Sequence, residues 1–104
     1  MARSAIKELE KLIQFPKQGI FSTVLANGET SNHTLMCMSK GSDMSEHTST
    51  REAAVTVLKG KGVFMLGKKK IKMKPGVFIF MPRNAPHSLK AHENLAFLLS
   101  LFGK

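Results

Sequence analysis

Residues 60–91 read GKGVFMLGKKKIKMKPGVFIFMPRNAPHSLKA, a stretch in which short apolar runs alternate with turn residues. The turns that separate the runs are Gly67-Lys68, Pro75-Gly76 and Pro82-Arg83-Asn84. Val, Ile and Phe are frequent in the runs, and no run is long enough for a stable helix. The stretch therefore predicts four strands, at residues 62–66, 69–74, 77–81 and 87–91.

The same pattern continues toward both ends of the chain. Further short apolar runs cover residues 19–25, 33–39, 53–59 and 95–102. Eight short strands joined by tight turns predict an all-β fold, either an antiparallel sandwich or a small barrel.

A helical spacing precedes the first of these runs, in the residues Ile6, Leu9, Leu12 and Ile13. Ser4 is suited to cap this helix, and Pro16 ends the pattern. We therefore divide the chain into an N-terminal helical segment, residues 1–18, and a β-barrel, residues 19–104, within a single domain.

The composition restricts the class of protein. A chain of 104 residues has room for one modest core. Its longest strongly apolar stretch, Leu95 to Phe102, is far shorter than the roughly 20 residues of a membrane-spanning helix, so we expect no membrane partner. Cys37 is the lone cysteine and lies in an apolar run, which indicates a small buried residue in a reducing compartment. Lys and Glu mix at the N-terminus where a secretion signal would be apolar, so we expect a cytoplasmic protein.

The charge is strongly positive, with 16 Lys and Arg against 7 Asp and Glu. Part of it lies between Lys68 and Lys74, where strand alternation places Lys70, Lys72 and Lys74 on one face. That face is either a solvated surface or a stripe that binds a polyanion. Specific nucleic-acid binding is disfavoured, because it needs exposed aromatic residues among the basic ones, and most phenylalanines lie in the predicted core runs.

Two short motifs surround His47 and His87. The first is Glu46-His47-Thr48, followed by a strand that ends in Val57-Leu58-Lys59-Gly60. The second is Met81-Pro82-Arg83-Asn84-Ala85-Pro86-His87-Ser88-Leu89-Lys90-Ala91. In these motifs and their spacing, residues 19–102 resemble the cupin superfamily, and within it the small single-domain cupins. The resemblance implies an antiparallel jelly-roll β-barrel, in agreement with the strand pattern.

The resemblance also implies a metal site, from which this chain departs. Metal-binding cupins supply three His and one further His or carboxylate from the two motifs. By position, the first and last of these ligands are His47 and His87, whereas the other two positions hold Ser49 and Ala53. The ligand set for a divalent transition metal is therefore incomplete, because such sites normally use at least three protein ligands.

A complete metal site would need a residue from outside the matching positions. Glu52 is the candidate third ligand, but strand alternation turns its carboxylate out of the barrel unless residues 48–52 form a bulge. His33 and His92 are the other candidates to complete the site from elsewhere in the chain, although neither belongs to the motifs. We therefore expect a degenerate metal site.

Without a metal, the two motif histidines form the polar end of an apolar pocket in the barrel mouth. The predicted lining comprises His47, Ser49, Ala53, Val55, Val57, Phe78, Phe80, His87, Leu89, Met36 and Met38. Neutral imidazoles both donate and accept hydrogen bonds, so a carboxylate, a phenol or an enol suits this pocket.

These patterns favour a cytoplasmic cupin that binds a small molecule without an obligatory metal. The alternatives are a metal-dependent dioxygenase or isomerase, and a basic protein that binds nucleic acid or another polyanion; the sequence leaves open whether the protein is an enzyme. We also expect a homodimer, because residues 77–81 and 95–99 are apolar on both faces and need a second layer.

Overall fold

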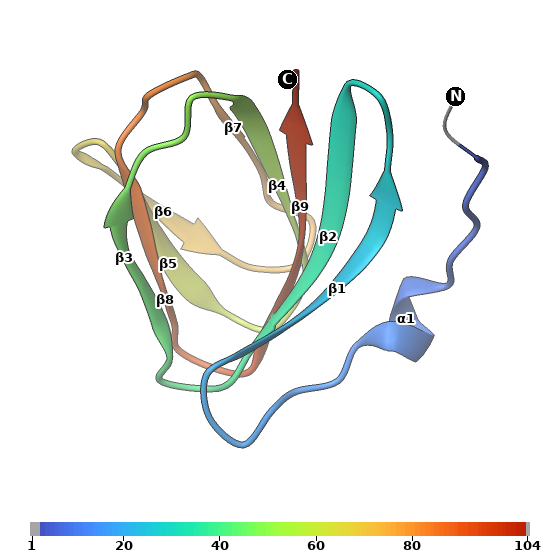
Figure 1. Cartoon of the computed structure of the whole chain (residues 1–104). Helices are drawn as coiled ribbons and strands as arrows, with labels where there is room; N and C mark the ends of the chain where they lie inside the picture. The colour runs from blue at the N-terminus through green and yellow to red at the C-terminus, as the bar shows by residue number, and fades with distance from the viewer. Residues whose placement is uncertain (1–2, 104) are drawn as a thin grey trace.

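A computed structural model describes residues 3–103, which form one short helix and nine strands (Figure 1). In chain order the elements are α1 (Leu9–Leu12), β1 (Ile20–Asn27), β2 (Ser31–Met38), β3 (Asp43–His47), β4 (Glu52–Lys59), β5 (Gly62–Leu66), β6 (Lys69–Met73), β7 (Phe78–Met81), β8 (His87–Ala91) and β9 (Leu95–Phe102). Each predicted run coincides with one of these strands to within a few residues at its ends.

The strands form two antiparallel sheets that face each other (Figure 1). One sheet has the order β1-β2-β9-β4-β7 and the other the order β3-β8-β5-β6. Apolar side chains from both sheets meet between them, among them Val55 of β4, Phe64 of β5 and Phe97 of β9, all almost completely buried. The fold is therefore the antiparallel all-β jelly roll that the sequence predicts.

The strand β3 is the element that the sequence pattern missed. It reads DMSEH, and its Asp43, Ser45 and Glu46 are exposed, while Met44 packs against the core. A bulge between Met44 and His47 also interrupts its pairing with β8. A short edge strand with one core side chain carries no apolar alternation that could reveal it.

The N-terminal helix is shorter than predicted. Only Leu9–Leu12 is helical, Glu8 rather than Ser4 occupies the N-cap without a side-chain hydrogen bond, and Ile6 is 93% exposed. A single turn is not stable on its own in water, so packing decides how far the helix extends. The packing comes from three side chains that cover Leu35, Cys37 and Ala96 on the outer face of the five-stranded sheet; they are Leu12, Ile13 and Phe15.

Two further observations concern Cys37 and the length of the helices. Cys37 is 1% exposed and behaves as the small core residue that its apolar run predicts. Among residues 3–103, no helix is long and apolar enough to span a membrane.

Candidate functional site

The imidazoles of His47 and His87 lie against each other at one end of the barrel. The two residues are paired across β3 and β8, and their ring centroids are 4.1 Å apart with the ring planes at 62°. His87 is 8% exposed and stacks in parallel on Phe64 at 5.9 Å, whereas His47 is exposed. The core therefore fixes the ring of His87, and His47 contacts it from the solvent side.

A backbone hydrogen bond fixes the tautomer of each ring. Nδ1 of His47 lies 2.8 Å from the carbonyl oxygen of Ser45, and Nδ1 of His87 lies 2.9 Å from that of Ala85. A carbonyl oxygen only accepts, so each Nδ1 carries the hydrogen and donates it. The Nε2 atom of each neutral ring is consequently left with a free lone pair, available to a hydrogen-bond donor or to a cation.

A cavity of about 220 Å³ opens beside the two imidazoles, and we call it the mouth cavity. Its lining comprises His47, Ser49, Arg51, Ala53, Met81, Pro82, His87, Leu99 and Leu101. A smaller space of about 30 Å³, the inner cavity, lies toward the core. Its lining comprises Met44, His47, Val55, Phe64, Met81, His87, Leu89, Phe97 and Leu99.

Five residues of the mouth cavity are missing from the predicted lining: Met81, Pro82, Leu99, Leu101 and Arg51, which is the only charged one among them. The guanidinium of Arg51 donates from Nη2 to the carbonyl oxygen of Gly103 at 2.6 Å and from Nε to that of Phe102 at 3.3 Å. These two bonds hold the cation at the rim of the mouth cavity and leave other N–H groups free. Arg51 lies in the turn just before β4, between Ser49 and Ala53, where strand alternation does not assign a face.

The predicted lining divides into three groups. His47, Ser49, Ala53 and His87 line the mouth cavity, and Val55 and Leu89 line the inner cavity. Val57 and Met38 are fully buried in the core, and Met36 packs against that core; none of these three lines either cavity.

The third group, Phe78 and Phe80, was assigned to the wrong face. Phe78 is 63% exposed and Phe80 is 47% exposed, on the outside of the five-stranded sheet. Ile79 and Met81 point inward instead, and Met81 pairs with Ala53 of β4. The alternation of β7 decides which side chains face the barrel, and it places the even-numbered positions 78 and 80 outside.

The side chains do not provide the ligand set of a metal-binding cupin. Glu52 is exposed and pairs regularly with Phe102, while Ala53 beside it is 2% exposed, so the bulge that would turn Glu52 inward does not form. His33 lies in the five-stranded sheet, where it hydrogen bonds to Ser31 and Ser100.

His92 follows β8 and lines a different cavity, near β6. Within the described chain, no group of three His, Cys, Asp or Glu side chains is placed to hold a metal ion. Two imidazoles are fewer ligands than iron, manganese or zinc require, so this donor set does not fit those metals.

Comparison with known proteins agrees with the fold. Residues 34–101 match the model of the cupin domain. An uncharacterized protein of Aquifex aeolicus (strain VF5) is 30% identical over 99 residues, which cover 93% of this chain and 82% of that protein. A cupin superfamily protein from Desulfitobacterium hafniense superposes with a TM-score of 0.87 at 18% identity, covering 100% of this chain and 99% of that one.

A conserved protein of unknown function from Streptococcus pyogenes superposes with a TM-score of 0.86 at 23% identity, covering 100% of this chain and 91% of that one. At these identities the two structures show the fold alone, whereas the domain match spans more than half of the chain. Together with the paired histidines of the two motifs, that match shows that the protein belongs to the cupin family.

Proposed function

We propose that this cupin binds a small organic anion in the mouth cavity, without an obligatory metal. The observation that carries the proposal is that one guanidinium and two imidazoles, whose Nδ1 atoms are already engaged by backbone carbonyls, line one apolar cavity. Small-molecule sites are commonly apolar with a few polar groups that orient the ligand.

The polar groups define the ligand. The guanidinium of Arg51 is a planar fork that matches a carboxylate. The Nε2 lone pair of either His47 or His87 accepts the single hydrogen of a ligand hydroxyl group. Ala53, Met81 and the leucines of β9 offer the body of the ligand only dispersion and apolar contact. The ligand is therefore a hydroxy acid with an apolar or aromatic body.

The test is calorimetric titration of chelator-treated protein with 4-hydroxybenzoate, benzoate and 4-hydroxybenzamide. Removing either the carboxylate or the hydroxyl should weaken binding by about tenfold, since each forms hydrogen bonds that are charged or buried. Retention of full affinity by 4-hydroxybenzamide, or no binding of any of the three, would contradict the proposal.

The matching variants are Arg51→Gln and the double substitution His47→Ala/His87→Ala. Arg51→Gln should remove the preference for the acid over the amide, and the double variant should remove the preference for the hydroxyl. His33→Ala removes an imidazole from the other side of the sheet and serves as the control. Unchanged affinity in the double histidine variant would refute the assignment of the site.

A further inference from the structure

A cavity of about 370 Å³, separate from the mouth and inner cavities, lies beside β5 and β6. Basic side chains from three segments border it. We call it the lysine groove. Its lining comprises Lys61, Gly62, Val63, Lys70, Lys72, Met73, Lys74 and His92. Its size falls within the range of about 300–1,000 Å³ that is typical of small-molecule sites.

In the described part of the chain, no carboxylate neutralises the charge of the groove lysines. Alternation along β6 turns Lys70 and Lys72 outward, while Ile71 and Met73, each next along the chain, pack on the core. The lining contains no acidic residue, and no ion pair within residues 3–103 joins a groove lysine to a carboxylate. Four ammonium groups around one cavity raise its positive potential, which an anionic ligand would relieve.

The backbone holds two of the groove residues in place relative to each other. The carbonyl oxygen of Lys61 accepts hydrogen bonds from the backbone N–H of His92 at 2.9 Å and of Glu93 at 3.0 Å. Gly60 has a φ of +89°, and a Cβ there would overlap the carbonyl oxygen of Asn94. The turn before β5 and the turn after β8 are therefore locked together, so that Lys61 and His92 are positioned before any ligand arrives.

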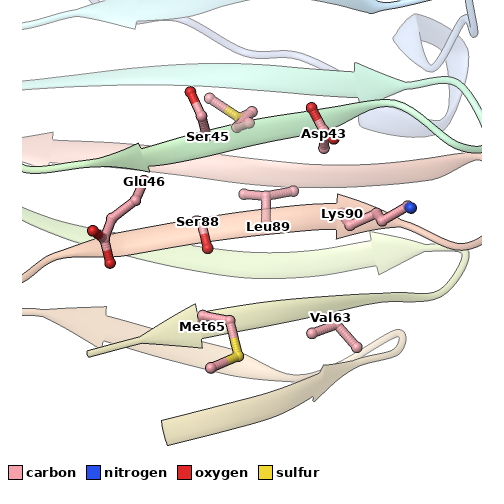
Figure 2. A pocket seen from close by; sticks show the side chains of 9 residues that line it. Asp43, Ser45, Glu46, Val63, Met65, Ser88, Leu89 and Lys90 are labelled. Atoms are coloured by element: carbon pink, nitrogen blue, oxygen red, sulfur yellow. The ribbon is translucent and has the colours of Figure 1, made fainter. Parts of the chain in front are cut away.

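The surroundings of the groove limit the size of the ligand. Figure 2 shows the neighbouring hollow on the same outer face, where Asp43, Ser45 and Glu46 of β3 lie beside Ser88 and Lys90 of β8. Val63 lines both hollows. A polyanion laid across the sheet would meet the carboxylates of Asp43 and Glu46, so the face favours a compact anion at the β6 side.

We propose that the lysine groove binds a small ligand with two or more phosphate groups on an apolar or aromatic body, such as a nucleoside diphosphate. The lysines and His92 contact the phosphate oxygens, and Val63 contacts the body. The groove lies outside the barrel, so this site is independent of the mouth cavity.

The test is titration of the intact protein with adenosine diphosphate, pyrophosphate and adenosine at about 150 mM salt, where long-range attraction is screened. Adenosine diphosphate should bind more tightly than either of its parts. Lys70→Gln/Lys72→Gln should weaken its binding at least about tenfold, because two charged hydrogen bonds are lost.

Lys68→Gln/Lys69→Gln is the matched control. It removes the same charge from the end of the turn and the first residue of β6, whose lysines do not line the groove, and should change the affinity by less than about twofold. An equal loss of affinity for adenosine diphosphate in the two variants, or no binding of adenosine diphosphate to the unaltered protein, would overturn the proposal. Tighter binding of a single-stranded oligonucleotide, weakened equally by both variants, would replace it with a general polyanion surface.

His47→Ala/His87→Ala should leave the binding of adenosine diphosphate unchanged. A failure at the groove is thereby distinguishable from a failure at the mouth cavity. If the double histidine variant also lost adenosine diphosphate, the two sites would not be independent and the groove would not be the binding site.

Discussion

At the scale of single residues, the chemistry of the barrel mouth depends on which nitrogen of each imidazole carries the hydrogen. The carbonyl oxygens of Ser45 and Ala85 both select Nδ1, although the two residues belong to different segments. In metal sites, a backbone acceptor on one ring nitrogen likewise orients the other nitrogen toward its ligand. The barrel mouth shows this arrangement for two rings. The other two positions at which metal-binding cupins place ligands hold Ser49 and Ala53, which are not strong ligands.

The tautomers are directly measurable. We expect long-range ¹H–¹⁵N correlation spectra, recorded at a pH where the rings are neutral, to show the Nδ1–H form for both His47 and His87. A hydroxy acid in the mouth cavity should shift the Nε2 resonances more than the Nδ1 resonances, because Nε2 accepts its hydroxyl. An Nε2–H tautomer at either residue would contradict the hydrogen bonds described above.

At the scale of elements, the turns between strands differ in how tightly they are packed. Gly60→Ala should destabilise the protein by at least about 3 kcal/mol, because a left-handed φ costs about 1–2 kcal/mol for a side chain and the added Cβ also overlaps Asn94. Gly67→Ala should cost only about 1–2 kcal/mol, since φ there is +59° and the Cβ would meet nothing within 4 Å. Urea unfolding measures the free energy of unfolding of both variants. An equal decrease in the two would mean that the turn at Gly60 is not held tightly against Asn94.

Elements also show what the sequence could predict and what it could not. Runs such as residues 53–59 and 87–91 were assigned correctly because their apolar alternation and turn residues are local signals. The strand β3, the extent of α1 and the parity of Phe78 depend on packing between segments that are distant in the chain. The missing ligands at Ser49 and Ala53 were evident from the motifs, whereas Arg51 depends on carbonyl groups that come from residues 102 and 103.

At the scale of the whole molecule, the outer face of the five-stranded sheet is covered over only part of its width. The N-terminal segment packs over Ala96 and its neighbours, but Phe78 and Phe80 on the edge strand β7 stay exposed. We therefore expect the homodimer interface to form at β7 rather than at β9, because the N-terminal segment of the same chain already covers part of β9.

Sedimentation at micromolar concentration should therefore show a dimer, and Phe78→Ser/Phe80→Ser should convert it to a monomer. These side chains face away from the barrel, so the monomer should keep its affinity for the hydroxy acid. Lys68→Ser/Lys69→Ser alters two exposed residues of the other sheet and should leave the dimer intact. A wild-type protein that sediments as a monomer would refute the expectation.

The position of β9 has a consequence for biosynthesis. The strand is formed by residues 95–102, yet it lies in the middle of its sheet and pairs with both β2 and β4 (Figure 1). While the chain is being translated, β2 and β4 have no partner between them until these residues leave the ribosome. The five-stranded sheet therefore closes only after translation has passed residue 102. Until then β2 pairs with β1 and β4 with β7, and each leaves its other edge without a partner and open to chaperones.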